Sequence, residues 1–261
     1  MPSTRAARPR RVEREEVALC LANGAEVRLL RVRDPRARRL RLSVDARGAR
    51  LTVPCSASLR EAEAFVAEHG AWLLRELADC AAAASAVSFA RGWDRPLPLR
   101  GTTVPVRWRE GRFARAGLER GAVVVELPGR AGDAAARRLL HEFYLAEARA
   151  DVGRWLPRYL PDLPAAPGAI RIRPLVSLWG SLSSGNAVSL DLSLVLAPPA
   201  AFEYVLVHEL CHLVRRDHSP AFWREVEARC PGWRRQRAWF RDHGSALKAI
   251  LAGLLGRDRG A

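Results

Sequence analysis

Apolar residues in the first half of the chain mostly alternate with polar ones, which is the spacing of β-strands. The segment from Val17 to Pro54 holds such runs, interrupted at Asn23-Gly24 and again at Arg47-Gly48. Short turns of this kind favour β-hairpins, so we expect two hairpins here. Residues 92–128 show short strand-like runs again, separated by Gly-rich turns. The pattern therefore predicts a β-rich N-terminal region over residues 17–130.

A helix interrupts this β-rich region. Ser58 followed by Glu61 is a capping-box pattern, and apolar residues then recur every three or four positions from Leu59 to Leu77. This spacing predicts an amphipathic helix. His69 lies beside its apolar stripe, so we interpret it as a histidine at the edge of the core rather than a ligand.

A second helix is expected over about residues 133–156, capped by Asp133. It contains His141-Glu142, which resembles the start of a metal-binding motif. Leu145 stands where the second histidine of that motif would be, so we expect no metal there. Four prolines between residues 157 and 167 then predict an irregular linker.

The C-terminal half begins with two strand-like runs on either side of Ser184-Gly185-Asn186, and we interpret Ile170 to Leu196 as a β-hairpin. Pro198-Pro199 leads into the next helix. Apolar residues from Phe202 to Leu213 recur at helical spacing, which predicts an amphipathic helix. The whole pattern predicts an α+β fold, with residues 131–256 as a second domain.

Composition supports a globular chain that does not enter a membrane. The hydrophobic content is 49%, and no apolar run reaches the roughly 18–20 residues that a membrane-spanning helix needs. Residues 1–16 are basic and polar, and we expect them to be a disordered tail. No apolar signal-peptide core follows them, so we expect a cytoplasmic protein. The five cysteines are widely spaced, which favours reduced thiols over disulfides.

The charge balance is strongly basic. The net charge is +15, and Lys248 is the only lysine, so arginine supplies nearly all of the positive charge. A surface of this kind attracts polyanions in a salt-dependent way. We therefore expect nonspecific polyanion binding, and a nucleic-acid-associated function stays open as an alternative.

The stretch "HELCHLVRRDH", residues 208–218, holds three of the six histidines. On a helix, His208 and His212 lie one turn apart on the same face, where both rings can bind one ion. Glu209 points about 100° around the helix axis, so its carboxylate is aimed beside the ion, at a bound water. This is the HExxH arrangement of zinc hydrolases, in which the glutamate is the general base.

A catalytic zinc takes three protein ligands and keeps one position open, and we favour His218 as the third. Its spacing is that of the extended HExxHxxGxxH motif, although Arg215 replaces the glycine of that motif. Ser219-Pro220 can begin a helix directly afterwards, which would fix His218 at a corner. Glu225 and Glu227 on that following helix are rival ligands.

With these residues in hand, the chain resembles the YgjP-like metallopeptidases, which are related to SprT-like and WLM proteases and more distantly to M48 peptidases. The resemblance covers roughly residues 25–245 and is carried mainly by "YVLVHELCHLVRRDHSPAFWREVEARCPGWRRQRAWFRDHG" and "LWGSLSSGNAVSLDLSLVLAPP". It implies a zincin-like domain with a β-hairpin beside the HExxH helix, zinc held by His208, His212 and His218, and Glu209 as catalytic base.

The hairpin departs from the family pattern. Leu178 and Leu182 stand where the family usually has Arg and Cys, and Asp191-Leu192 where it has Asn-Trp. Some members of the family act as pyrophosphohydrolases on UTP, so a metal-dependent nucleotide hydrolase is an alternative to a peptidase.

We expect a zinc-dependent peptidase that acts on a protein or peptide substrate. The hairpin could offer a strand edge to an extended peptide. Arg215, Arg216 and His243 are candidates for stabilising the oxyanion, while the substrate-binding residues and the oligomeric state stay unassigned.

Overall fold

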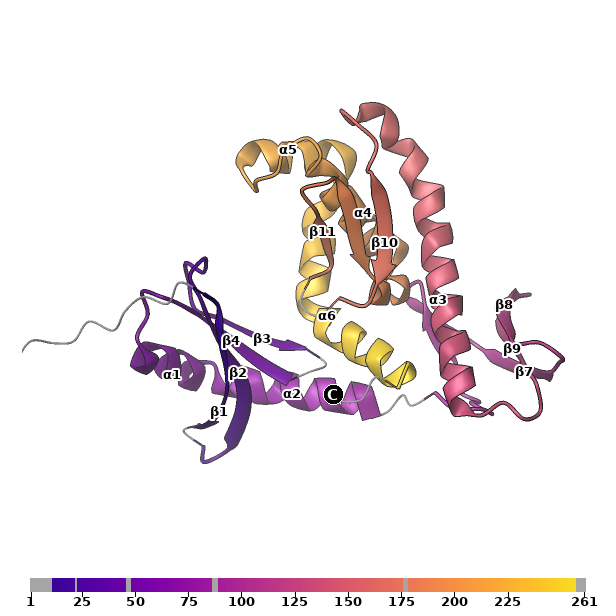
Figure 1. Ribbon diagram of the computed structural model, residues 1–261, viewed down its shortest axis with the longest axis horizontal. Helices are drawn as coiled ribbons and strands as arrows, with labels where there is room; N and C mark the ends of the chain where they lie inside the picture. The colour runs from indigo at the N-terminus through magenta and orange to yellow at the C-terminus, as the bar shows by residue number, and fades with distance from the viewer. Residues whose placement is uncertain (1–10, 22, 46–47, 86–88, 176–177, 257–261) are drawn as a thin grey trace, which may run out of the picture. The chain divides into compact units, whose positions relative to one another are not determined.

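The computed structural model describes residues 11–21, 23–45, 48–85, 89–175 and 178–256 (Figure 1). The chain forms two compact units, which divide between residues 83 and 84. Helices and several small sheets are both present, so the predicted α+β class is confirmed. None of the described helices is long and apolar enough to cross a membrane.

The first unit is a four-stranded sheet with two helices. The strands are β1 (Glu13–Cys20), β2 (Glu26–Asp34), β3 (Arg41–Asp45) and β4 (Gly48–Pro54), in the order β1-β2-β4-β3. The pairs β1/β2 and β3/β4 are antiparallel, which confirms both predicted hairpins, although residues 46–47 of the second turn lie outside the described residues. The central pair β2/β4 is parallel. Strand β1 includes residues 13–16, so the expectation that these four residues are disordered is wrong.

The predicted helix over residues 59–77 is two helices, α1 (Leu59–Glu68) and α2 (Gly70–Ser85). The capping box at the start of α1 is confirmed, because Ser58 and Glu61 bond to each other's backbone N–H groups. His69 lies at the junction, and its Nδ1 is 2.9 Å from the carbonyl of Phe65. This contact satisfies the ring within the chain, as expected for a histidine at the edge of the core.

The second unit begins with short strands that share its core. These are β5 (Leu97–Leu99), β6 (Thr102–Val104), β7 (Val106–Glu110), β8 (Arg115–Glu119) and β9 (Ala122–Leu127). Buried side chains of β5 and β9 belong to the same apolar cluster as those of the helices that follow. The described structure therefore groups residues 89–130 with the C-terminal half, whereas the sequence pattern grouped them with the N-terminal sheet.

The long helix α3 (Asp133–Trp155) follows, and two 3-10 turns (Leu156–Arg158 and Leu160–Asp162) occupy the Pro-rich linker. Gly132, not Asp133, is the N-cap residue, and no side chain caps the helix. The carboxylate of Asp133 instead accepts a hydrogen bond from the backbone N–H of Arg91. The prediction that Asp133 caps this helix is wrong, and its carboxylate is instead bonded to Arg91, 42 residues earlier in the chain.

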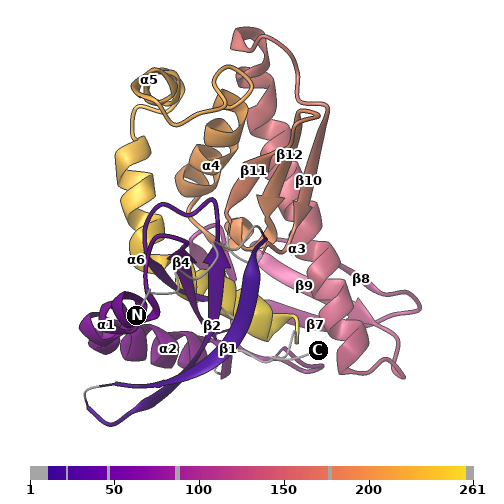
Figure 2. The same cartoon turned by 60° about the vertical axis from the view of Figure 1, so that its left-hand side comes forward.

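The predicted hairpin over residues 170–196 is a three-stranded sheet of β10 (Ala169–Arg173), β11 (Gly180–Leu182) and β12 (Ala187–Asp191). The order is β10-β12-β11, so β11 lies at an edge. Only β11 and β12 form the hairpin. Strand β10 pairs with β12 in parallel (Figure 2), a non-local pairing that turn signals cannot predict, and residues 192–196 form a 3-10 helix.

Three helices complete the unit, namely α4 (Pro199–Cys211), α5 (Pro220–Arg229) and α6 (Trp233–Leu254). Helix α4 packs against α5, α6, β11, β12 and α3. Its buried residues lie around its whole circumference, so the predicted amphipathic character is wrong. A helix covered on all sides has no solvent-facing stripe, and polar residues on it stand out.

The only lysine of the chain ties α6 to this sheet. The Nζ of Lys248 donates to the carbonyls of Leu175 and Leu178 at 2.8 and 2.9 Å, and lies 3.2 Å from Oδ2 of Asp191. The Asp191 side chain is 2% exposed and also accepts from the backbone N–H groups of Leu175 and Ser193. Both charges therefore have a full set of partners, which is the condition for a buried ion pair to be stable.

We predict that Lys248→Met destabilises the protein by about 3–5 kcal/mol, because it leaves a buried carboxylate without its cation. The free energy of unfolding from urea titration measures this loss. The double variant Lys248→Met/Asp191→Asn should recover part of the stability, since it removes the uncompensated charge. A single-variant loss below about 1 kcal/mol would show that the pair is not a structural tie.

Candidate metal centre

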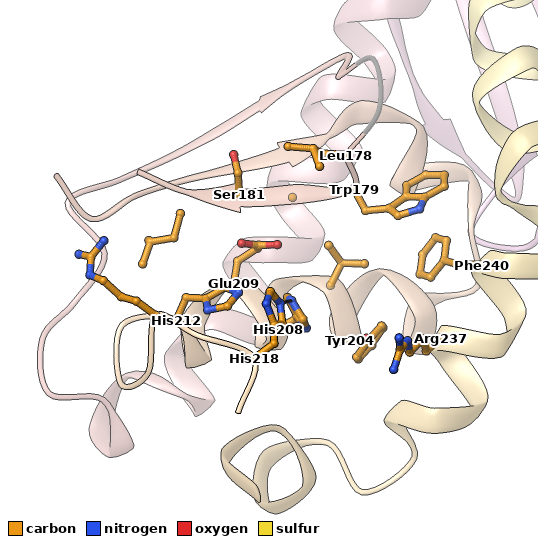
Figure 3. Close-up of a pocket in the computed structure, with 14 residues that line it drawn as sticks. Leu178, Trp179, Ser181, Tyr204, His208, Glu209, His212, His218, Arg237 and Phe240 are labelled. Carbon is orange, nitrogen blue, oxygen red and sulfur yellow. Dashed lines mark hydrogen bonds between the residues drawn. The ribbon is translucent and has the colours of Figure 1, made fainter. Parts of the chain in front are cut away.

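The three histidines of the HELCHLVRRDH stretch converge at the end of α4. His208 lies in its last turn, His212 is its C-cap residue, and His218 precedes Ser219, the N-cap residue of α5. One nitrogen from each ring lies within 4.8 Å of the other two. The Nε2 atoms of His208 and His218 are 3.1 Å apart (Figure 3). Two nitrogens bound to one tetrahedral zinc lie roughly 3.3 Å apart, so this arrangement fits a zinc ion.

The turn after α4 fixes the orientation of His212. The Nδ1 of His212 is 2.9 Å from the carbonyl oxygen of Arg215. A carbonyl only accepts, so Nδ1 carries the proton and Nε2 keeps its lone pair for a metal. Arg215 is not among the described residues with positive φ. The turn therefore does not need the glycine that the extended motif has at this position, and His218 is reached without it.

Electrostatics favour the neutral form of the His208 and His218 imidazoles. Burial lowers the pKa of His208 to about 3, with further contributions from His212, His218 and Arg237. Burial and the neighbouring His212 also lower the pKa of His218. Neutral imidazoles with free lone pairs are the form that binds a metal. The donor chemistry of the cluster therefore agrees with its geometry.

The ring of Phe222 packs against all three imidazole rings. Its ring centroid lies 4.9, 4.4 and 4.9 Å from those of His208, His212 and His218, and its side chain is fully buried. The Ser219-Pro220 start of α5 is confirmed, because the Ser219 hydroxyl accepts from the N–H of Phe222. We did not predict this role of Phe222, although its position four residues after His218 is a usable signal.

Glu209 lies beside the histidines but is not one of the clustered ligands. It is 5% exposed, and burial raises the pKa of its carboxyl group to about 8. Within the described part of the chain, its carboxylate has no hydrogen-bond partner. A divalent cation nearby would favour the ionised form. Figure 3 shows the carboxylate between the histidines and β11.

Strand β11 approaches Glu209 so closely that only glycine fits. A Cβ placed on Gly180 would lie 2.6 Å from both Cγ and Oε1 of Glu209. Such a contact is far shorter than van der Waals distance, so any side chain at position 180 would displace the glutamate. Glycine at position 180 thus leaves the space that the Glu209 side chain occupies.

The rival ligands have other partners. Glu225 forms an ion pair with Arg229 at 2.6 Å, and Glu227 contacts Trp233 and Arg234. Among the described residues, neither joins the histidine cluster. Of the remaining histidines, His141 contacts Glu142, and His243 stacks on Trp239 with ring centroids 4.8 Å apart.

A cavity of about 450 Å³ opens beside the cluster. Besides the three histidines and Glu209, it is lined by Leu178, Trp179, Gly180, Ser181, Leu182, Tyr204, Val205, Arg216, Arg237 and Phe240. Of the three oxyanion candidates, only Arg216 lines it. The guanidinium of Arg216 is bound to the β11–β12 turn through Ser183, Ser184 and Asn186. Sequence reasoning missed Tyr204 and Arg237, because their spacing from the histidines carries no motif.

Three converging imidazoles and a buried glutamate at one wall of a cavity are the components of a metal-dependent hydrolase. Comparison with known families agrees with this class. The family model "YgjP-like, metallopeptidase domain" matches residues 38–243, and the chain belongs to this family. Membership implies a hydrolase that uses a divalent metal and acts on protein or peptide substrates.

One solved structure is similar to part of the chain. The crystal structure of the metallopeptidase zymogen of Pyrococcus abyssi abylysin is 29% identical over 40% of this chain and 92% of its own, with a TM-score of 0.27. That TM-score is too low to equate the two folds. No curated protein matches the chain in sequence.

We predict that the purified protein binds about one zinc ion per chain. His218→Ala should lose most of this zinc, because it removes one of the three converging nitrogens. Glu225→Ala and Glu227→Ala should retain it, since both carboxylates are engaged elsewhere. Metal analysis after dialysis measures the ratio. If His218→Ala keeps its full zinc content and either glutamate variant loses zinc, the third ligand is that glutamate of α5 and not His218.

Proposed function

We propose that the protein is a zinc-dependent peptidase that hydrolyses peptide bonds with a water molecule activated beside Glu209. His208, His212 and His218 would hold the zinc. The observation that supports this most strongly is the juxtaposition of three metal-binding nitrogens with a buried carboxylate that has no other hydrogen-bond partner among the described residues. Structural zinc sites are usually closed by four ligands, whereas this cluster supplies three.

When bound, zinc supplies a Lewis acid that polarises the scissile carbonyl and makes water acidic enough to attack near neutral pH. The residues of the chain do the proton transfer. The Glu209 carboxylate accepts a proton from the attacking water and then delivers it to the nitrogen of the leaving amine. Gly180 leaves room for this carboxylate beside the histidines, because a Cβ at that position would lie 2.6 Å from its Oε1.

The substrate would lie along β11. This strand is at the edge of its sheet and lines the cavity over its whole length, Gly180–Leu182. An extended peptide can pair its backbone with such an edge. Arg216 holds the β11–β12 turn through three hydrogen bonds, so we assign it a positioning role for this edge. A flexible or unfolded protein segment is the substrate that can adopt the required extended form.

The two alternatives are less well supported. Hydrolysis of a nucleoside triphosphate needs several groups that hold phosphates, and the walls of the cavity are mainly apolar. Of the two arginines that line it, Arg216 is engaged by the β11–β12 turn, which leaves Arg237 alone for a triphosphate. In the arginine-rich stretch of α6, Arg234 and Arg241 pair with Glu227 and Asp242. A structural zinc site in a nucleic-acid-associated protein does not explain why Glu209 has no hydrogen-bond partner in the described ranges, nor why the cluster supplies only three ligands. Nonspecific polyanion binding stays a prediction from net charge.

We predict that Glu209→Gln keeps the fold and the zinc but loses about 10²–10⁴ in hydrolysis rate, because the amide cannot accept the proton of water. Zinc content and the thermal unfolding midpoint serve as controls for the intact site. Activity equal to that of the wild type in a zinc-loaded Glu209→Gln protein would rule out this role.

The substrate class can be tested in parallel assays. Zinc-loaded protein is incubated with a denatured protein mixture and, separately, with UTP, and the Glu209→Gln protein serves as the blank. We expect new peptide termini and no pyrophosphate release above the blank. Pyrophosphate release without new termini would replace the peptidase proposal with the nucleotide one.

A further inference from the structure

One end of the cavity is apolar, and it directly adjoins the metal ligands. Figure 3 shows Trp179 and Phe240 together on one side of His208, with Tyr204 on the same side, beside Arg237. Val205 and Leu178 line the same cavity. These residues come from two helices and a loop: Tyr204 and Val205 lie on α4, Phe240 lies on α6, and Trp179 lies in the loop before β11.

The wall formed by Trp179 is held in place by one face of α6. Phe240, Gly244 and Lys248 are spaced by four residues, so they lie above one another on that face. The ring centroids of Phe240 and Trp179 are 4.6 Å apart. A Cβ on Gly244 would lie 2.7 Å from Cζ2 of Trp179, and Nζ of Lys248 lies 4.6 Å from the ring centroid. This part of the cavity is therefore formed before any ligand arrives.

Charge adds a second feature to the same region. Arg237 lines the cavity and lies on the same face of α6, three residues before Phe240. Its guanidinium lies 5.2 Å from the ring centroid of Trp223 and has no ion-pair partner in the described part of the chain. An unpaired guanidinium at this place repels lysine and arginine side chains of a ligand.

We propose that Leu178, Trp179, Tyr204, Val205 and Phe240, with Arg237 at the rim, form the subsite that selects a large apolar residue beside the scissile bond and rejects a basic one. This inference rests on the proposed peptidase function and names its substrate class. A phenylalanine or leucine side chain buries its apolar surface there, and the continuity of the cavity with Glu209 and the histidines brings the adjoining backbone to the reacting centre.

The test measures binding rather than turnover. Zinc-loaded Glu209→Gln protein is titrated with capped octapeptides of Gly, Ser and Ala that carry one variable residue, which is Phe, Leu, Ala or Lys. A single variable residue lets each peptide find its own register in the cleft. We expect the Phe and Leu peptides to bind about tenfold more tightly than the Ala peptide, because burying a large apolar side chain is worth about that factor. The Lys peptide should bind no more tightly than the Ala peptide.

Single substitutions show whether the preference for apolar peptides comes from the subsite or from nonspecific binding elsewhere on the protein. Trp179→Ala in the same background should reduce the Phe-to-Ala ratio to about twofold or less, provided that zinc content and the unfolding midpoint are retained. Leu178 is 52% exposed at the mouth of the cavity, so Leu178→Asp removes apolar surface without threatening the fold. It should lower the same ratio and strengthen binding of the Lys peptide. Phe113→Ala is the control, because Phe113 is 69% exposed and does not line the cavity.

The outcomes distinguish this inference from the proposed function. Equal affinities for all four peptides, or a ratio unchanged in both Trp179→Ala and Leu178→Asp, would overturn the subsite. Selective binding of Phe and Leu peptides by a protein whose wild type cleaves no peptide would support the subsite and remove the peptidase proposal. Peptide cleavage by the wild type, without selective binding of the Phe and Leu peptides, would support the peptidase proposal and overturn the subsite.

Discussion

The buried pair of Asp191 and Lys248 joins the segments that build one side of the cleft. Asp191 ends β12, the carbonyls of Leu175 and Leu178 belong to the segment that leads into β11, and Lys248 lies on α6. The same ammonium group lies over the ring of Trp179. The edge strand and the aromatic wall are thus positioned by one charged group. In a chain whose other cations are all arginine, the compact ammonium with its three donors suits a site with three acceptors.

A second constraint is the close approach of β11 to α4. Placing Glu209 among apolar side chains without a hydrogen-bond partner costs stability, and the raised pKa of its carboxyl group expresses that cost. Because Gly180 lets the strand lie directly against the glutamate, water is kept from one side of the carboxylate. A polar group that lowers stability at the wall of a cavity is typical of residues placed for chemistry rather than for folding.

Local features of the fold could be predicted from the sequence, and non-local ones could not. The Asn23-Gly24 hairpin, the capping box of Ser58 and Glu61, and the Ser219-Pro220 start of α5 depend on neighbouring residues, and all three are present. The parallel pairing of β10 with β12 depends on a crossover, which leaves no turn signal. The surroundings of α4 also escaped prediction, because helical spacing of apolar residues does not reveal how many faces a helix buries.

The candidate site shows the same division. His208, Glu209, His212 and His218 lie within eleven residues, so their spacing alone could suggest a metal site, and the structure brings the three histidines together. Arg237 and Tyr204 reach the cavity through helix packing, and Trp179 meets Phe240 across 61 positions (240 − 179). Contacts at that separation follow from tertiary structure only, so substrate-binding residues could not be assigned from the sequence.

Gly244 lies directly against Trp179, which lines the apolar end of the cavity. Glycine inside a helix costs about 1 kcal/mol relative to alanine, and Gly244 lies in the middle of α6, where a Cβ would strike Trp179. The helix therefore gives up stability to make room for the aromatic wall. The histidines lie at the end of α4 and on the segment between α4 and α5, and they pack on Phe222. The three atoms nearest to a Cβ on Gly244 all belong to Trp179. A side chain at position 244 would therefore displace Trp179, at the apolar end of the cavity, before it affected the histidines.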